Sequence, residues 1–271
     1  MTTAATAADA TLPSARRGET TGVLARLNPV SRVLGLMLWT TPLVITIDWV
    51  SAAVALACAA LMVPLSGISP GMVLRRAVPL LVAAPISGLS MVLYGAPEGR
   101  LYASFLLAHV TDNSLELGLA IFLRVLAVGL PVIVLTAGID PTDLGDGLAQ
   151  VLRLPARFVL ATMAGVRLLT LFIDDWRALT RARRARGLGD SGRLRRLASQ
   201  VFALLVFALR RGAKLSTAME ARGFGAPGPR TWGRISRFGA GDWVLLAVCA
   251  CFAALALGVS AALGHFRFLG M

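Results

Sequence analysis

The sequence predicts an all-α integral membrane protein with about five transmembrane helices and a cytoplasmic coupling domain of three helices, two of them long. Hydrophobic residues make up 56% of its 271 residues and charged residues only 15%. The mean hydropathy is +0.74, well above that of an ordinary soluble domain. Five apolar stretches have the roughly 17 to 25 residues that a spanning helix needs. The formal net charge is nevertheless +13, and most of the basic residues gather in one interval.

The chain begins with a polar stretch, residues 1–28, which is rich in Ala and Thr and lacks a signal-peptide pattern. We expect it to be a disordered cytoplasmic tail. Four spans are expected in residues 29–138, coupling helices in the cytoplasm in residues 139–240, and the fifth span in residues 241–271. The apolar stretches themselves run from about Val30 to Ile47, Trp49 to Leu65, Ala77 to Tyr94, Leu117 to Ala137 and Trp243 to Leu263.

Two further apolar runs, Phe158–Ile173 and Leu197–Leu209, are not expected to span. The second has 13 residues and reaches only about 20 Å at 1.5 Å per residue, against a hydrocarbon core of about 30 Å. If both runs crossed the membrane, the strongly basic linker between them would be translocated, which violates the positive-inside rule. The interval is therefore assigned to the cytoplasm, together with the N-terminus, in a multi-pass protein of the cell membrane.

Prolines and glycines divide this interval into three helices. Pro141 begins a short helix that ends before Pro155. Pro155 opens a long helix to Arg186, and Ser191 is expected to cap a second long helix to Arg222. Both long helices are too apolar to be fully solvated, so we expect them to pack on a partner or at the membrane interface.

The two long helices end in nearly the same residues, Ala185-Arg186-Gly187-Leu188-Gly189 and Ala221-Arg222-Gly223-Phe224-Gly225. Glycine ends a helix at low steric cost, and arginine in the last turn is favoured by the helix dipole. Ordinary C-capping of a basic helix would need nothing more. A functional interpretation adds a partner with carboxylates, because the planar guanidinium can bind Asp or Glu through two hydrogen bonds.

At these residues the chain resembles the T components of energy-coupling factor (ECF) transporters, a family that includes CbiQ-like cobalt-transporter subunits. The resemblance rests on the two Ala-Arg-Gly motifs, on Glu220 before the second, and on Arg230-Thr231 after it. It extends to Leu27-Asn28-Pro29 with Arg32, where the family has Leu-His-Pro-x-x-Lys, and to Leu123-Arg124-Val125-Leu126 followed by Asp140-Pro141. Asn28 in place of His and the loop from Gly95 to Glu116 depart from the family pattern.

The resemblance implies a transmembrane coupling subunit with three kinds of partner. Two cytoplasmic ABC-type ATPases would receive the docking residues Ala185, Arg186, Gly187, Ala221, Arg222 and Gly223, with Glu220 and Arg124 in possible support. A membrane-embedded S component would bind a vitamin or a transition metal such as cobalt and be reoriented by ATP hydrolysis. Membrane lipids would surround the spans. The chain itself would be no enzyme and would need no cofactor or metal.

Alternatives remain at this stage. The basic cluster could bind anionic lipid or nucleic acid, although the docking interpretation predicts no nucleic-acid partner. Asp143-x-x-Asp146-Gly147 resembles the start of the metal motif of membrane CDP-alcohol phosphotransferases, but the rest of that motif is absent. Arg124 inside the fourth span could contact the S component or a transport pathway, or extend to the outer interface.

Overall fold

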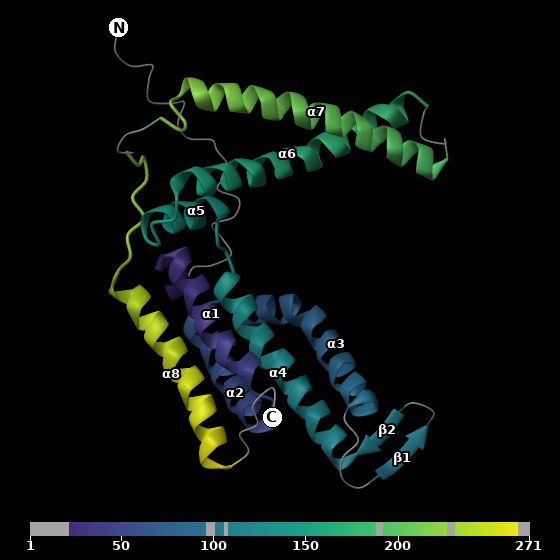
Figure 1. Ribbon diagram of the computed structural model, residues 1–271, viewed down its shortest axis with the longest axis vertical. Coiled ribbons are helices and arrows are strands. Elements are labelled where there is room, and N and C mark those ends of the chain that lie inside the picture. The colour runs from purple at the N-terminus through teal and green to yellow at the C-terminus, as the bar shows by residue number, and fades with distance from the viewer. Residues whose placement is uncertain (1–21, 96–100, 106–107, 188–191, 227–230, 265–271) are drawn as a thin grey trace. The chain divides into compact units, whose positions relative to one another are not determined.

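The computed structural model describes residues 22–95, 101–105, 108–187, 192–226 and 231–264. The chain divides into two compact units, one formed by Met1–Asp140 with Arg237–Met271 and the other by Pro141–Ser236. Figure 1 shows the helices and strands of the two units. The predicted boundaries at 138/139 and 240/241 also assign each segment to a side of the membrane, and that assignment stays a prediction.

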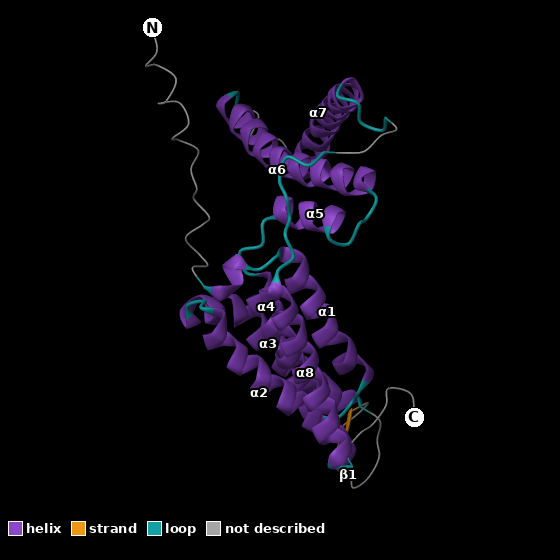
Figure 2. Ribbon diagram, turned by 90° about the vertical axis from the view of Figure 1, so that its left-hand side faces the viewer, coloured by secondary structure: helices purple, strands orange, loops and turns teal. Residues whose placement is uncertain are grey.

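The first unit is a bundle of helices with one small hairpin (Figure 2). A 3₁₀ turn, η1, spans Val23–Arg26 before the first long helix. The elements that follow are α1 (Pro29–Ile45), α2 (Trp49–Ser66), α3 (Pro70–Tyr94), β1 (Leu101–Phe105), β2 (Ala108–Thr111), α4 (Asp112–Thr136) and α8 (Ala240–Ala262). The second unit contains α5 (Pro141–Gln150), α6 (Ala156–Ala185) and α7 (Arg193–Ala221).

The structure confirms the predicted all-α membrane fold. Five helices within the described residues are long and apolar enough to cross a membrane, namely α2, α3, α4, α6 and α8. The number is the one predicted, but the set differs at one helix. α1 has 17 residues and is a shorter apolar helix, whereas α6 meets the same length and composition requirements. The expectation that α6 stays outside the bilayer rests on its basic second half, and it remains a prediction.

Helix α4 is central to the bundle because it packs against α1, α2 and α3, while α8 packs against α1 and α2. Trp39 of α1 is fully buried. Its indole Nε1 donates to the Ala127 carbonyl of α4 at 3.1 Å, and its ring meets Phe252 of α8 edge to face, with centroids 5.9 Å apart. A buried indole N–H needs such an acceptor, so this one side chain joins three helices.

Helices α3 and α4 approach each other through glycine. A Cβ at Gly118 would lie 2.9 Å from the Gly88 carbonyl oxygen and closer still to Val92. Such contacts are typical of membrane helices, where apolar lipid provides no hydrophobic drive and close backbone packing stabilises association.

A buried polar network joins the starts of α1 and α8. The Asp242 carboxylate accepts hydrogen bonds from the backbone N–H of Asn28 at 2.8 Å and the hydroxyl of Ser31 at 2.6 Å. Its second oxygen accepts from the Gly239 N–H at 2.7 Å. Asn28 also caps α1, since its Oδ1 accepts from the Val30 N–H at 3.0 Å. Asp242 is 4% exposed, and its lone pairs are used as a buried carboxylate requires.

A second network lies at the far end of α8. Asp48 caps α2 by accepting from the Ser51 N–H at 2.8 Å and the Ser51 hydroxyl at 2.7 Å. The hydroxyl of Ser260, near the end of α8, also donates to Asp48. Helix α8 is therefore held by a buried carboxylate at each end.

Several sequence expectations need correction. The tail predicted for residues 1–28 is not wholly disordered: Val23–Arg26 form η1 and Leu24 is buried, while residues 1–21 lie outside the described part. Helix α3 begins at Pro70 and α4 at Asp112, both earlier than predicted. At the start of α4, Thr111 and Ser114 form a capping box. The predicted start was later because it was placed at the first apolar residues. The loop after α3 contains the antiparallel hairpin β1–β2, which was not predicted.

Replacing Asp242 should destabilise the bundle more than replacing any exposed carboxylate. In Asp242→Ala the buried donors of Asn28 and Ser31 and the partly buried N–H of Gly239 lose their acceptor, which should cost about 3 kcal/mol. We expect a clearly lower midpoint of thermal unfolding in detergent. Asp174→Ala is the control, because that side chain is 71% exposed and lies 3.7 Å from Arg177. Equal midpoints for the two variants would contradict the role given to Asp242.

Candidate functional site

The second unit is built on a close contact between α5 and α6. A Cβ at Gly145 would collide with the Met163 side chain of α6, and Gly145, Gly147 and Ala149 are buried. The first aspartate of the phosphotransferase-like run, Asp143, pairs with Arg234 at 3.1 Å. The glycines of this run therefore have a packing role. Among the described residues no three His, Cys, Asp or Glu side chains are grouped to hold a metal ion.

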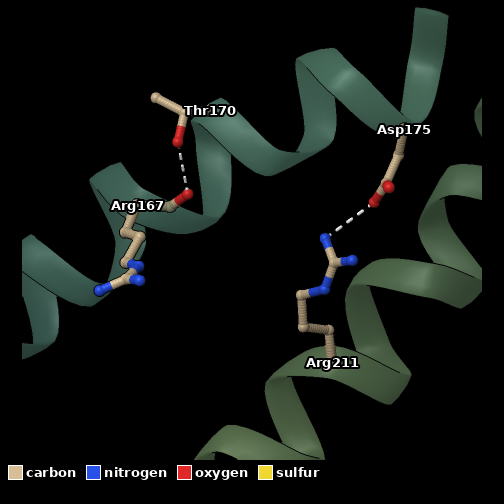
Figure 3. Close-up of polar contacts among 4 residues, drawn as sticks. All are labelled: Arg167, Thr170, Asp175 and Arg211. Carbon is tan, nitrogen blue, oxygen red and sulfur yellow. Dashed lines mark hydrogen bonds and ion pairs between the residues drawn. The ribbon is translucent and has the colours of Figure 1, made fainter. Parts of the chain in front are cut away.

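Helices α6 and α7 run in opposite directions and cross (Figure 1). The side-chain contacts agree with the antiparallel direction, because the residue numbers rise along α6 as those of their partners fall along α7. Three pairs join the helices: Asp175 with Arg211, Thr180 with Gln200, and Arg183 with Ser199. Figure 3 shows Arg211 pointing at Asp175 across the two helices, with Nη1 and Oδ2 2.8 Å apart.

Both helices end as the sequence predicted. Gly187 has φ 72° and Gly223 has φ 77°, the left-handed conformation that favours glycine after a helix. The N–H of Gly187 donates to the Arg184 carbonyl at 3.1 Å, and the N–H of Gly223 donates to the Glu220 carbonyl at 2.9 Å. At the end of α7 the Phe224 N–H also donates to the Met219 carbonyl at 2.9 Å, which completes a Schellman motif. The one correction is at the start of α7, whose N-cap is Gly192 rather than Ser191.

The predicted docking residues are all on the surface. Ala185, Arg186 and Gly187 are exposed, and so are Ala221, Arg222 and Gly223. Neither Arg186 nor Arg222 forms an ion pair within the described residues. Glu220 accepts instead from the Ser216 hydroxyl one turn earlier, at 3.3 Å. Two guanidinium groups at helix ends are thus available to a partner.

The two helix ends are not brought together. Because the helices are antiparallel, the end of α6 lies beside the start of α7, and the two arginines are separated by about the length of α7. Its 29 residues correspond to roughly 40 Å at 1.5 Å per residue. A single small ligand cannot bind both groups, so the geometry fits two separate contacts.

Two arginines that no sequence motif predicted form hydrogen bonds near these helix ends. Arg157, in the first turn of α6, donates to the Gly225 carbonyl at 2.9 Å and so ties the residues after Arg222 to the neighbouring helix. Arg183 donates to Ser199 near the other end. No local pattern predicts these pairs, because their partners are 68 and 16 residues away in the sequence.

Much of the apolar surface of this unit is uncovered. Within its described residues the buried apolar side chains are Ala149 and Val159. Eleven large apolar side chains of the two long helices are exposed by 40% or more: Phe158, Val166, Leu169, Ile173, Leu194, Leu197, Val201, Phe202, Leu205, Phe207 and Leu209. A patch of this kind marks a surface that binds a partner or a membrane.

Arg124 belongs to α4 in the first unit, whereas Arg186 and Arg222 belong to the second. Its Nε and Nη2 atoms are buried and have no hydrogen-bond partner within the described residues. An ionisable group at such a depth usually faces protein or water. Its assignment as a supporting residue stays a prediction.

Comparison with known proteins gives consistent results. A protein family described as CbiQ, cobalt transport protein, matches residues 20–231. The chain is similar to the energy-coupling factor transporter transmembrane protein EcfT of Lacticaseibacillus paracasei, with 26% identity over 81% of this chain and 87% of that protein. It is also similar to the proteins of the same description from Listeria innocua, with 25% identity over 82% and 88% of the two chains, and Bacillus selenitireducens, with 33% identity over 44% and 49%.

Gly→Ala should have opposite effects at the end of α7 and inside it. In Gly223→Ala the side chain is forced into the left-handed region at a cost of about 1 kcal/mol, so the end of α7 frays. We expect trypsin to cleave after Arg222 several times faster, as followed by mass spectrometry.

Gly212→Ala is the matched control, since Gly212 lies inside α7 with no atom within 4 Å of the new Cβ. Alanine there should stabilise the helix by roughly 0.5–1 kcal/mol and slow cleavage nearby. Faster cleavage in both variants would contradict the assigned conformations.

Proposed function

The chain belongs to the CbiQ family of cobalt transport proteins, and from this premise we propose that it is the transmembrane coupling subunit, or T component, of an energy-coupling factor importer. Its role is to link ATP hydrolysis by two cytoplasmic ABC-type ATPases to the reorientation of a membrane-embedded S component. The S component selects the vitamin or transition metal that is taken up.

One observation carries this proposal: the same exposed Arg-Gly ending occurs at both ends of the antiparallel α6–α7 pair. A guanidinium at a helix end can insert into a groove lined with carboxylates and bind there through two hydrogen bonds. Two such groups about 40 Å apart are suited to two partner subunits, one at each end. Arg186 and Arg222 have no competing ion pair among the described residues.

The uncovered apolar side chains of α6 and α7 support the S-component contact. A soluble surface rarely exposes this many large apolar groups along two helices, and Phe202 and Leu209 are 68% and 66% exposed. An apolar partner embedded in the membrane would bury them. The same surface can also contact the membrane interface, so lipids complete the set of partners.

The energy for transport comes from the partners. The sequence contains no Gly-x-x-x-x-Gly-Lys-Ser/Thr loop, and the nearest candidate, Arg211-Gly212-Ala213-Lys214-Leu215-Ser216, lacks the first glycine and the spacing. A membrane subunit of a transporter without its own nucleotide site fits the role of a mechanical link rather than an enzyme.

The distribution of basic residues supports an orientation in the membrane. Eight arginines lie between residues 177 and 196, against one aspartate, and such segments stay on the cytoplasmic side. The second unit and the N-terminus are therefore assigned to the cytoplasm of a protein in the cell membrane. The ATPases are expected on the same side.

Charge reversal at the two helix ends should abolish ATPase binding. We expect Arg186→Glu, Arg222→Glu to lose both ATPase copies in affinity purification from the native host, with mass spectrometry as the measurement. Each single variant should lose about one copy of the two, because the ends act separately.

The matched control is Arg184→Glu, Arg210→Glu, which changes the net charge equally at two exposed arginines of the same helices. It should retain the ATPases. Arg186→Lys, Arg222→Lys should weaken recovery although the charge is kept, because lysine lacks the planar fork. Equal loss in the control, or full recovery with lysine, would instead indicate a general electrostatic surface for anionic lipid or nucleic acid.

A further inference from the structure

The chain passes between its two units twice, after Asp140 and after Ser236. If the second unit transmits movement to the helix bundle through the chain, both connections carry it. Each connection begins or ends near a glycine: Gly138 has φ 67°, and Gly239 immediately precedes α8. A single flexible connection would bend when the second unit moves and would not transmit that movement to the helix bundle. How the ends of the connections are held therefore matters.

In the first unit, one turn of α1 holds both connections. The Nδ2 group of Asn28 donates to the Arg237 carbonyl at 3.1 Å, at the residue where the chain returns. One turn later, Nη1 of Arg32 donates to the Ala137 carbonyl at 3.1 Å, at the C-cap of α4. Asn28 is 7% exposed and Arg32 4%. These two buried side chains join backbone atoms 100 residues apart in the sequence.

The Arg32 contact has a clear electrostatic basis. A helix C-terminus carries partial negative charge on its free carbonyls, and a cation there is stabilising. Asp242, which accepts from Asn28 and Ser31, carries a charge opposite to that of Arg32. The start of α8, the end of α4 and the start of α1 thus form one polar cluster.

In the second unit, α5 holds the other ends of the same connections. α5 begins at Pro141, directly after the first connection. At its last residue, the Gln150 side chain donates to the Arg234 carbonyl at 2.8 Å and accepts from the Ser236 N–H at 2.9 Å. Asp143 pairs with Arg234 at 3.1 Å. The outgoing helix and the returning segment are therefore joined within this unit as well.

We propose that Asn28, Arg32 and Gln150 are positioning residues for energy coupling: by tying the two connections together in each unit, they make them move as one element between the ATPase-binding helices and the bundle. This inference rests on the proposed function. It assigns to these polar residues a role that neither docking nor membrane packing requires. The side chains act on backbone carbonyls, so the identity of residues 137 and 237 is not essential to the contact.

The test uses the purified complex with its ATPases and compares hydrogen exchange with ADP and with a non-hydrolysable ATP analogue. In the wild type, the exchange rates of peptides covering residues 134–140 and 237–243 should differ between the two nucleotides by about fivefold, the factor that one hydrogen bond supplies. Asn28→Ser keeps an N-cap oxygen but is too short to reach Arg237, so its 237–243 peptide should lose the nucleotide response. Arg32→Met should lose the response of 134–140, and Arg32→Lys should restore it.

Two further variants separate coupling from folding. Ser260→Ala removes a buried hydrogen bond of the same kind at the opposite end of α8, and its nucleotide response should match the wild type. Gln150→Leu alters only the second unit and should lose the response of 237–243, which provides a test if α1 variants fail to fold. ATPase recovery and hydrolysis should persist in all of them.

A nucleotide response that survives in Asn28→Ser, Arg32→Met and Gln150→Leu would overturn the inference, and so would its absence from the wild type or its loss in Ser260→Ala. Failure of the proposed function has a different signature: no ATPase would be recovered with the wild-type chain at all.

Discussion

The buried carboxylate of Asp242 is the interaction on which the membrane bundle depends. It accepts hydrogen bonds from the first turn of α1 and from the backbone before α8, so that two helices more than 200 residues apart start at the same place. Asn28, Ser31 and Asp242 are all buried, so water does not satisfy these groups and they depend on one another. Asn28, which caps α1, and Gly239, which precedes α8, both donate to this one carboxylate. Asp48 has the equivalent role at the far end of α8, where it accepts from Ser260.

Those parts of the fold that depend on local sequence could be predicted. The length of the apolar stretches predicted the helices of the bundle. The limits of the long helices were predicted from Pro155, Gly187 and Gly223, because the backbone preferences of proline and glycine are local. The contacts that join α1 to α8 and α2 to α8 could not be predicted, since Asn28 and Asp242, like Asp48 and Ser260, are more than 200 residues apart in the sequence. The early starts of α3 and α4 were missed because polar residues such as Arg75 and Thr111 fall outside an apolar window. Length and composition also cannot separate α6 from a spanning helix, and its assignment rests on the basic residues that follow the apolar run and on the shortness of the next apolar run.

The candidate site likewise has features that the local sequence predicts and features that it does not. The conformation of each Arg-Gly end is encoded within five residues, so both were predicted correctly. Their separation is a property of the antiparallel pairing, which is set by Asp175 with Arg211 and Thr180 with Gln200. The second unit buries few large apolar side chains of its own, and its stability therefore depends on whatever covers α6 and α7, because a bound partner adds its binding free energy to that of the fold. Exposed apolar side chains on α6 and α7 destabilise the isolated unit, and burying them against a partner stabilises the complex.

The antiparallel arrangement of two helices with the same ending has a consequence for symmetry. Exchanging the ends of the pair by a half-turn brings one Arg-Gly terminus onto the other, so a single asymmetric chain presents an approximate two-fold axis. Most homodimeric proteins are themselves two-fold symmetric. If Arg186 and Arg222 dock as proposed, one chain of this kind can match a dimer of identical ATPases at the equivalent groove of each subunit. A mutation in the groove of an identical partner subunit would alter both contacts at once. A mutation at Arg186 or Arg222 would alter only one of them, so the two contacts can evolve different strengths.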